Sequence, residues 1–380
     1  MNGEFLQGRA GLFDCLQANL GVLADRLHGV GTHLRLGAVL RLRPRPGPDG
    51  LPTVEPPVEE VLADAADLLG LAVAEEWPRA DGAWARPLDG PVWVVADAYH
   101  LPWVPYHRQR HIEHSFLVEP GGDGPAVTDA YLNDTPWGAA RPQRLAFGRD
   151  ELAAVLDADS GPARAFRFSP VDLGPLPEEA EPLDDTLVDD YLHSYAEHPD
   201  RKAALDRFTM ETWLLARSRR LRATYLGEHA GQRVPQPVEE HLGRWDGLVE
   251  HTYLASRRVA RGRAEPPGLL TRAAEALRGD AVLLSAKGWE SDGSPGAPEE
   301  ITAAVEGTVR QVLRVQEPLD ADADLRALPA FNSLRMLEIV DRLEETFAIE
   351  FGPGELVPEK LHRVRDLSRL VRRTIDGGTG

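Results

Sequence analysis

The chain of 380 residues contains one cysteine, Cys15, and four of its twelve histidines lie between residues 100 and 114. A cysteine thiol acts as a nucleophile when a nearby base takes its proton and a third group orients that base. Asp14 can cap a helix that begins at Cys15, where the helix dipole lowers a thiol pKa and favours the thiolate. Because the Asp14 carboxylate opposes this effect, the thiol still needs a base.

The segment HIEHSFLVEPGGDGPAVTDAY, residues 111–131, offers both a base and an acid. His114 leads into the apolar run SFLVE, and a glycine-rich turn separates it from AVTDAY, which carries Asp129. Two adjacent antiparallel strands can place these side chains next to each other. We therefore predict Cys15 as the nucleophile, His114 as its base and Asp129 as the acid that orients the imidazole.

Other interpretations of these residues stay open. His107 and His111 lie close enough in the sequence to compete with His114, although we expect them to serve the surface or a substrate pocket. A lone cysteine is also often a small buried apolar residue. We predict no metal site, because the four histidines are irregularly spaced and no cysteine or glutamate pair completes a zinc ligand set.

The overall charge restricts the class of partner. The chain has 61 acidic and 42 basic residues, a formal net charge of −19, which disfavours nucleic acid and anionic lipid as partners. No apolar run approaches a membrane span, and the N-terminus MNGEFLQGRAG lacks the features of a signal peptide. One cysteine cannot form an internal disulfide, so we expect a cytoplasmic protein.

Residues 1–172 mix helical and strand patterns. Apolar residues at steps of three and four predict a helix from Cys15 with one buried face, comprising Leu16, Leu20, Leu23 and Leu27. Alternation predicts a strand over 32–43, and periodicity predicts a helix over 58–73. Short β-rich runs predict further strands at 92–98, 115–119, 126–132 and 163–171.

Helical patterns dominate the rest of the chain. An acidic connection at 174–185 precedes a helical region, 186–282, whose Arg-rich stretch 216–229 we interpret as an ordinary solvated helix face. That stretch docking an acidic helix or substrate is the alternative. The composition of residues 286–298 predicts a flexible linker.

Residues 299–376 predict a four-helix bundle with short connections. Its second helix would begin near Asn332 or Ser333, with a short helical piece near 355–361. The residues that we expect to face inward in that second helix are Leu334, Leu337, Val340 and Phe347.

The segment FNSLRMLEIVDRLEETFAIEF, residues 331–351, resembles the second helix of acyl and peptidyl carrier proteins. That resemblance implies a covalent 4′-phosphopantetheine arm on Ser333, with a phosphopantetheinyl transferase and an acyl-loading ligase as partners. Asn332 stands where the family usually has Asp. The alternative is that Ser333 simply caps a helix.

The segments DCLQANLG, DAYHLPWVPYHRQRHIEHSFLVE and VTDAY resemble the N-terminal domain of butirosin-biosynthesis H-type proteins, a subset of papain-like cysteine enzymes. The resemblance covers about residues 5–170. It implies an α+β papain-like fold for residues 1–172 and the same three catalytic residues. It also implies Asp97, Tyr99 and His111 as substrate-pocket candidates, and Gln7 as an oxyanion candidate beside the backbone N–H of Cys15.

Together these features predict a cysteine-dependent acyltransferase of natural-product biosynthesis, which moves an acyl group from a carrier thioester through Cys15 to an amine or hydroxyl acceptor. A hydrolase with the same triad and a non-catalytic carrier-docking scaffold are the alternatives. A third alternative is that the first domain receives its acyl group from a different carrier, while the carrier on this chain is loaded for an external enzyme.

Overall fold

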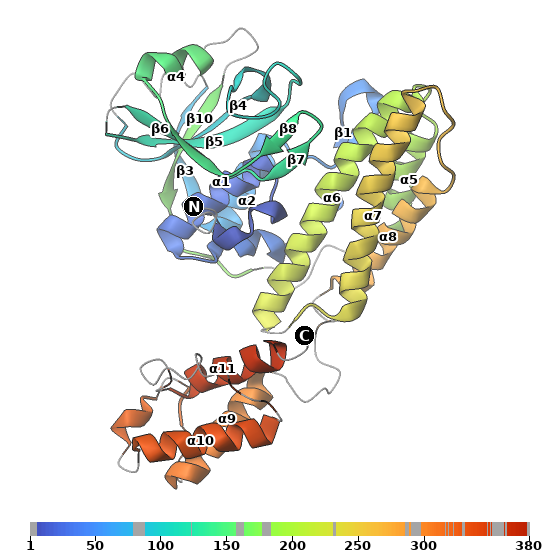
Figure 1. The fold of residues 1–380 in the computed structure, drawn as a ribbon. Coiled ribbons are helices and arrows are strands. Elements are labelled where there is room, and N and C mark those ends of the chain that lie inside the picture. Colours follow the sequence, from blue (N-terminus) through green and yellow to red (C-terminus); the bar gives the residue numbers. More distant parts are fainter. Residues whose placement is uncertain are drawn as a thin grey trace. The chain divides into compact units, whose positions relative to one another are not determined.

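A computed structural model gives the fold in two compact units, Met1–Leu226 with Val234–Gly288, and Gly227–Arg233 with Trp289–Gly380. Each unit is described by itself (Figure 1). The residues that the structure describes are 6–78, 88–122, 124–156, 163–176, 184–230, 233–285, 289, 298–315, 317, 319–321, 323–328, 331–347, 349, 351, 361 and 363–377.

The first unit is built on an antiparallel sheet with the strand order β3-β10-β4-β5-β6-β9. Its strands are β3 (Leu71–Trp77), β10 (Arg164–Pro170), β4 (Val92–Asp97), β5 (Glu113–Pro120), β6 (Pro125–Asp129) and β9 (Gln143–Ala146). Two small ribbons pair β1 (Arg45–Pro46) with β2 (Pro52–Thr53), and β7 (Asn133–Thr135) with β8 (Gly138–Ala140). The runs of branched and aromatic residues at 92–98, 115–119, 126–132 and 163–171 therefore coincide with β4, β5, β6 and β10 to within two residues at the start of each strand, and strands form there as predicted.

Helix α1 (Cys15–His28) begins where the sequence indicates, because the Asp14 carboxylate accepts the backbone N–H of Gln17 at 2.8 Å. Leu16, Leu20 and Leu23 are buried, as predicted. The prediction that Leu27 is buried on the same face is wrong, because Leu27 is 43% exposed. The helix ends one residue later, and its last turn extends beyond the core.

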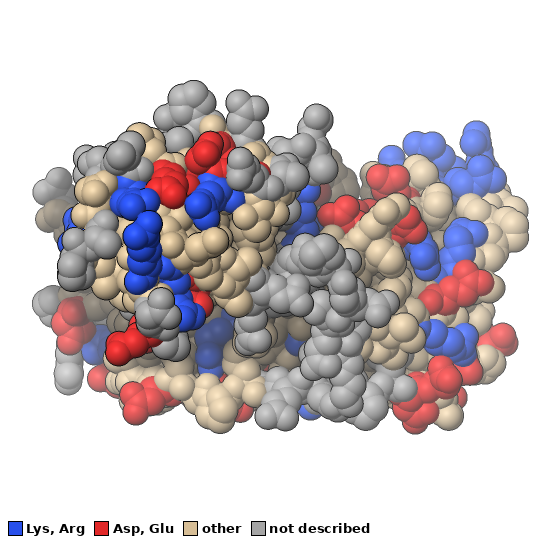
Figure 2. All heavy atoms as spheres, turned by 90° about the horizontal axis from the view of Figure 1, so that it is seen from below, with Lys and Arg blue, Asp and Glu red and all other residues tan. Residues whose placement is uncertain are grey.

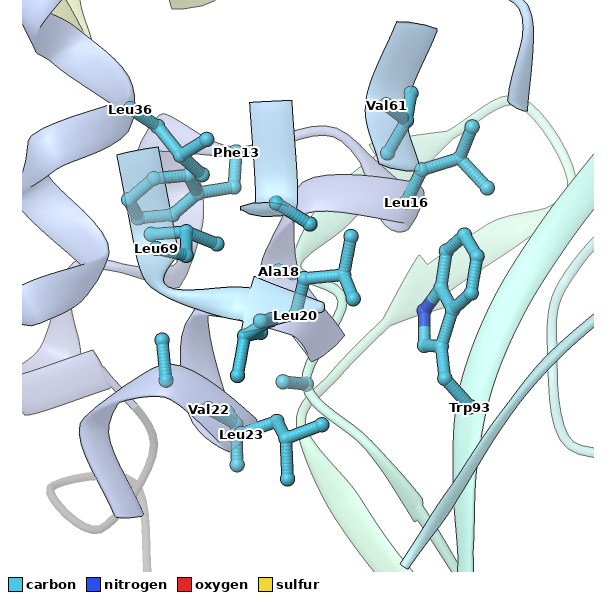
Figure 3. Close-up of a cluster of buried hydrophobic side chains, with 14 of the residues drawn as sticks. Phe13, Leu16, Ala18, Leu20, Val22, Leu23, Leu36, Val61, Leu69 and Trp93 are labelled. Carbon is cyan, nitrogen blue, oxygen red and sulfur yellow. The ribbon is translucent and has the colours of Figure 1, made fainter. Parts of the chain in front are cut away.

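Helix α1 packs against the sheet through a buried hydrophobic core. Phe13 and Leu16 pack among Leu69 of α2 (Val58–Leu69) and Trp93 of β4 (Figure 3). The Trp93 ring in turn lies 5.5 Å from the ring of Phe166 in β10. Large apolar side chains therefore surround the first turn of α1 and hold the thiol-bearing end of this helix in place.

Two expected elements are wrong. Residues 32–43 do not form a strand, since Thr32–Ala38 is a 3-10 helix. At Gly37 a Cβ atom would lie 2.6 Å from the Tyr225 Cβ, so α6 approaches the backbone more closely than the alternating pattern reveals. The helix expected over 58–73 stops at Leu69, because Gly70 adopts a left-handed conformation (φ 65°) and Leu71 begins β3.

The helical region forms a bundle within the same unit (Figure 1). Its helices are α5 (Asp185–Ala196), α6 (Arg201–Ala230), α7 (Gln236–Val259) and α8 (Leu269–Leu283), while the short α4 (Arg149–Leu156) belongs to the sheet region. Apolar and aromatic side chains fill the bundle, among them Tyr191, Tyr195, Phe208, Trp245, Leu248 and Leu277.

The interpretation of the Arg-rich stretch 216–229 as a solvated face is wrong. Arg219 is fully buried and pairs with Asp280 of α8, the Nε–Oδ2 distance being 2.8 Å. Arg222 is also buried, and its guanidinium donates to the carbonyl oxygens of Ala38 at 2.7 Å and of Leu284 at 3.1 Å. These arginines satisfy otherwise unpaired buried acceptors, a role that a count of charged residues cannot indicate.

The second unit contains α9 (Pro298–Leu313), α10 (Ser333–Phe347) and α11 (Val364–Gly377), with a 3-10 turn at Leu325–Ala327. Leu337 does not face inward as expected, because its side chain is 62% exposed. Among the side chains of α10 that the structure describes, those of Ile339, Val340 and Leu343 are buried, and Val340 was expected to be. The side chain of Leu334, most of the expected linker 286–298 and nearly all of the expected short helix at 355–361 lie outside the described residues.

Within the described residues, no helix is both long and apolar enough to cross a membrane. Figure 2 shows one face of the molecule, on which short runs of Lys and Arg side chains lie beside acidic ones. The net negative charge is therefore not spread as a uniformly acidic surface over the face drawn there.

Candidate active site

A buried imidazole–carboxylate pair lies at the ends of two neighbouring strands. His114 of β5 and Asp129 of β6 are 1% and 2% exposed, and their Nε2 and Oδ2 atoms are 2.8 Å apart. The indole N–H of Trp103 donates to the same carboxylate oxygen at 3.2 Å, and the backbone N–H of Tyr131 donates to the other at 3.0 Å. Asp129 is thereby held in one orientation and in turn orients the ring of His114.

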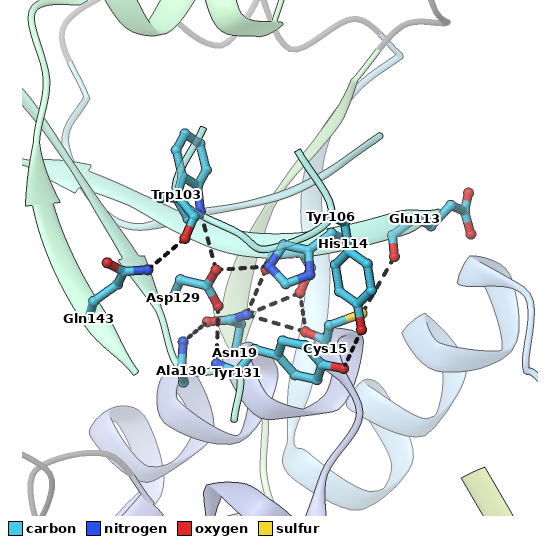
Figure 4. Close-up of polar contacts among 11 residues, drawn as sticks. Cys15, Asn19, Trp103, Tyr106, Glu113, His114, Asp129, Ala130, Tyr131 and Gln143 are labelled. Atoms are coloured by element: carbon cyan, nitrogen blue, oxygen red, sulfur yellow. Dashed lines mark hydrogen bonds and ion pairs between the residues drawn. The ribbon is translucent and has the colours of Figure 1, made fainter. Parts of the chain in front are cut away.

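Cys15 lies close to this pair, and no hydrogen bond among the described residues joins its Sγ atom to His114. Its Sγ atom is 3.5 Å from the carbonyl oxygen of Glu113, and the hydroxyl of Ser115 donates to the carbonyl oxygen of Cys15 at 2.7 Å. Both sequence neighbours of His114 therefore contact Cys15, and Figure 4 shows the imidazole between the Asp129 carboxylate and the Cys15 region. Among the contacts of the described residues, Nδ1 of His114 has no hydrogen-bond partner, which leaves this nitrogen able to accept a proton.

The side chain of Asn19 connects α1, β5 and the residue that follows β6, and no sequence-based prediction included it. Its side-chain amide donates to the carbonyl oxygen of Ser115 at 2.8 Å and to that of Cys15 at 3.2 Å. Its side-chain oxygen accepts the backbone N–H of Ala130 at 2.9 Å (Figure 4). An asparagine one turn after Cys15, within an otherwise apolar helix face, was the available sequence signal, and the structure shows it fully buried.

The electrostatic surroundings of the thiol differ from the sequence-based expectation. Burial raises the pKa of Cys15 well above its usual value, and the negative charges of Asp14, Glu55 and Asp129 raise it further. Desolvation and these carboxylates outweigh the helix dipole, so the expectation of a thiolate favoured by the helix start is wrong. The side chain is nevertheless partly exposed and can be reached. A base must therefore remove its proton as it reacts.

The Asp14 carboxylate is itself perturbed, since burial raises its pKa from 3.8 to about 6. Between these two pH values the native state holds a proton that the unfolded state has lost. The free energy of unfolding contributed by this group therefore falls as the pH rises through that window, and the charge that appears near pH 6 opposes ionisation of Cys15.

We expect Asp14→Asn to lower the pKa of the Cys15 thiol. Asparagine caps a helix as well as aspartate does, so α1 would keep its start while losing the adjacent charge. The pH profile of the iodoacetamide alkylation rate should shift to lower pH, and stability should vary less between about pH 4 and 6. Glu60→Gln is the control, because Glu60 lines the same pocket and is not among the charges with the largest effect on the pKa of Cys15. An unshifted profile for Asp14→Asn would contradict the expectation.

The remaining predicted site residues divide into two groups. Asp97, Tyr99 and His111 gather beside Glu113, with His111 Nδ1 2.6 Å from Asp97 Oδ2 and the rings of Tyr99 and His111 stacked at 4.2 Å. Gln7 lies in the turn Leu6–Gly8 with a positive φ of 52° and an exposed side chain. No contact of the described residues joins Gln7 to Cys15, so its oxyanion role stays a prediction.

An open pocket lies near the start of α1, between the segment 36–64 and α6. Asp14 and Gln17, which flank Cys15, form part of its lining. Its charged lining residues are of both signs, namely Asp14, Glu55, Glu60 and Asp64 with Arg41, Arg43, Arg45, Arg217 and Arg219. The pocket therefore presents charges of both signs near the start of α1, and Cys15 itself is not among its lining residues.

Arg217 of α6 connects the helical region to the site. Its guanidinium donates to the carbonyl oxygen of Phe13, two residues before Cys15, and to that of Leu132 at 2.7 Å, three residues after Asp129. The same group lies 4.2 Å from the ring centroid of Trp213. One side chain thus holds the loop before the thiol and the loop after the acid, and no sequence signal separated it from its neighbouring arginines.

We expect Arg217→Met to lower stability by about 2–3 kcal/mol, because carbonyl oxygens lose a charged donor, and to slow any reaction of Cys15. Thermal unfolding and the iodoacetamide alkylation rate at fixed pH measure the two effects. Arg220→Met is the matched control, since Arg220 on the same helix pairs with Asp246 in solvent. Equal alkylation rates in both variants would show that Arg217 does not position the thiol.

The second unit contains a candidate attachment point for a phosphopantetheine arm. Ser333 is the first residue of α10, and the Asn332 side-chain oxygen accepts the backbone N–H of Arg335 at 3.0 Å. Asn332 therefore supplies the cap that Asp would supply, and Ser333 stands at the helix N-terminus, where the dipole favours a phosphate group. This placement fits a phosphopantetheinyl serine.

Comparison with known proteins bears on the second unit. Residues 303–371 match the family described as "Phosphopantetheine attachment site", and no curated protein matches the chain. The mixed helix-and-sheet architecture of the first unit is seen in the structure, whereas its papain-like character stays a prediction. The chain thus ends in a helical carrier domain with a covalent 4′-phosphopantetheine cofactor, which makes a phosphopantetheinyl transferase its partner.

Proposed function

We propose that the chain is a cysteine-dependent acyltransferase that moves an acyl group from a carrier thioester through Cys15 to an amine. The observation that supports the proposal is a partly exposed cysteine that contacts both sequence neighbours of His114, whose imidazole forms a buried pair with Asp129, on a chain that also contains a carrier domain. The papain-like relationship of residues 1–172 belongs to this proposal.

The first half-reaction loads Cys15. The arm, attached at Ser333, supplies a terminal thiol that presents the acyl group as a thioester. The Cys15 sulfur attacks the acyl carbonyl carbon while His114 Nδ1 takes the thiol proton, and Asp129 stabilises the imidazolium through Nε2. The backbone N–H of Cys15, at the start of α1, can stabilise the developing oxyanion. The departing thiolate receives the proton from His114, so Cys15 holds the acyl group as a new thioester.

The second half-reaction releases the acyl group. An amine attacks the Cys15 thioester, His114 takes the ammonium proton that forms, and the proton passes to the departing Cys15 sulfur. The product is an amide and the enzyme returns to its thiol state.

An amine acceptor suits the charges beside the thiol. Asp14 and Glu55 line the pocket next to Cys15, and both act on its pKa as negative charges. Such carboxylates attract the ammonium form of an amine, which loses a proton before it attacks, while the arginines of the same lining suit an anionic part of a substrate. Tethering a carrier to the same chain also raises the effective concentration of the acyl donor at Cys15.

Intact-protein mass spectrometry tests the proposal. The full chain is modified with a phosphopantetheinyl transferase, loaded with an acyl group and then mixed with an amine. We expect one arm, mapped to Ser333, and an acyl adduct on Cys15 that disappears as amide accumulates. Ser333→Ala should lose the arm, and a soluble acyl thioester should still acylate its Cys15. Release of free acid that added amines do not divert would indicate a hydrolase instead.

A further inference from the structure

Three potential metal ligands outside the catalytic pair meet at one end of the sheet. Asp97 is the last residue of β4, His100 closes the following 3-10 turn (Ala98–His100), and His111 lies two residues before β5. One potential ligand atom from each residue lies within 4.8 Å of the others. Such spacing is compatible with three ligands around one ion after a small side-chain adjustment.

The imidazole of His100 gives an independent indication of a ligand. Its Nε2 atom is buried and has no hydrogen-bond partner among the described residues. A buried polar atom that makes no hydrogen bond costs free energy, and such atoms in native proteins usually have an unseen partner. A cation bound between His100, Asp97 and His111 would provide that partner.

Outer contacts already orient the three groups. Asp97 Oδ1 accepts the backbone N–H of Tyr99 at 3.0 Å and of Ile112 at 3.3 Å, which leaves Oδ2 facing His111. The Tyr99 ring stacks on His111 at an interplanar angle of 13° and meets His100 edge-on with centroids 5.1 Å apart. Metal ligands typically depend on outer contacts of this kind.

We propose that Asp97, His100 and His111 bind one divalent late transition-metal ion, with Zn²⁺ as the reference ion. Two imidazoles and one carboxylate suit zinc, cobalt, nickel or copper, whereas magnesium and calcium prefer oxygen ligands alone. The His111 side chain is 65% exposed, so an ion can enter from solvent and keep a coordination position for water. The prediction of no metal site rested on the irregular spacing of the histidines and on the lack of a cysteine or glutamate pair, and it left Asp97 out of account.

The site lies close to the thiol without including it. Asp97 pairs with Glu113 across β4 and β5, and the carbonyl oxygen of Glu113 is the atom that contacts Cys15 Sγ. An ion would thus fix the strand ends against which the thiol rests. The metal proposal is independent of the acyltransferase proposal, because its ligands and its test involve neither transfer nor the carrier.

Metal binding is measured directly on the full chain after chelator treatment. Calorimetric titration with Zn²⁺ should give one ion per chain, and His100→Ala and His111→Ala should each weaken binding at least about tenfold. His107→Ala is the matched control, and Cys15→Ala should bind as the parent does. Circular dichroism checks that the variants fold, and His111→Ala, at an exposed position, keeps the test valid if His100→Ala unfolds.

Co²⁺ absorption supplies a second readout that reports the ligands. We expect d–d bands without a sulfur-to-metal charge-transfer band, and both histidine variants should lose them. The proposal is overturned if the chain binds no Zn²⁺ or if both histidine variants bind like the His107→Ala control. A charge-transfer band that Cys15→Ala abolishes would also overturn it, because the thiol would then be a ligand.

Discussion

Replacing Cys15 with alanine is expected to lower the rate of acyl transfer by about 10⁴-fold or more, because the covalent intermediate can no longer form. The sulfur is the only reactive atom in the proposal that accepts the acyl group, and neither His114 nor Asp129 can substitute for it. The measurement is amide formation from an acyl-loaded full chain, with intact-mass detection of the acyl adduct in the same samples.

Loading of the arm provides the internal control for this variant. Phosphopantetheinylation should proceed as in the parent, because Ser333 lies in the other compact unit. Cys15→Ser is a second control, since its hydroxyl keeps the size of the side chain and is a weaker nucleophile. Full transfer by Cys15→Ala would establish that the first unit is a scaffold that only docks the carrier.

The parts of this site that the sequence could predict are those encoded locally. Asp14 before an apolar helical pattern marks the start of α1, and two β-rich runs around a glycine turn bring His114 and Asp129 together. These signals need only neighbours in the sequence. The outward direction of Leu337 escaped the same reasoning, since which face of α10 is covered depends on α9 and α11.

What could not be predicted depends on contacts between distant segments. Gly37 packs against α6, nearly two hundred residues later in the chain, and this contact replaces the strand suggested by local alternation. Arg217 and Arg219 belong to the same Arg-rich stretch, and composition does not distinguish them, yet one reaches the thiol loop and the other a buried carboxylate. The raised pKa of Cys15 likewise needs the positions of Asp14, Glu55 and Asp129 in three dimensions.

Asp280→Asn is expected to have the largest effect on stability, about 3–5 kcal/mol, because it leaves the buried Arg219 guanidinium without its counter-charge. Asp280 is fully buried and accepts three donors, from Arg219 at 2.8 Å, His241 at 2.8 Å and Trp245 at 3.0 Å. Asparagine has nearly the same shape, so the loss would report the charge and not a cavity. Differential scanning calorimetry of the full chain measures it, with the unfolding transition of the carrier unit as an internal reference.

Two further variants distinguish the stability contribution of the buried Arg219–Asp280 pair from that of an exposed ion pair. Asp246→Asn breaks the exposed pair between Arg220 of α6 and Asp246 of α7, and is expected to cost less than about 1 kcal/mol. Arg219→Met combined with Asp280→Asn removes both charges and should recover much of the lost stability. If Asp280→Asn unfolds no earlier than Asp246→Asn, the buried pair does not hold α6 in place. The position of α6 next to the loop before Cys15 would then depend on Arg217 and its two carbonyl partners alone.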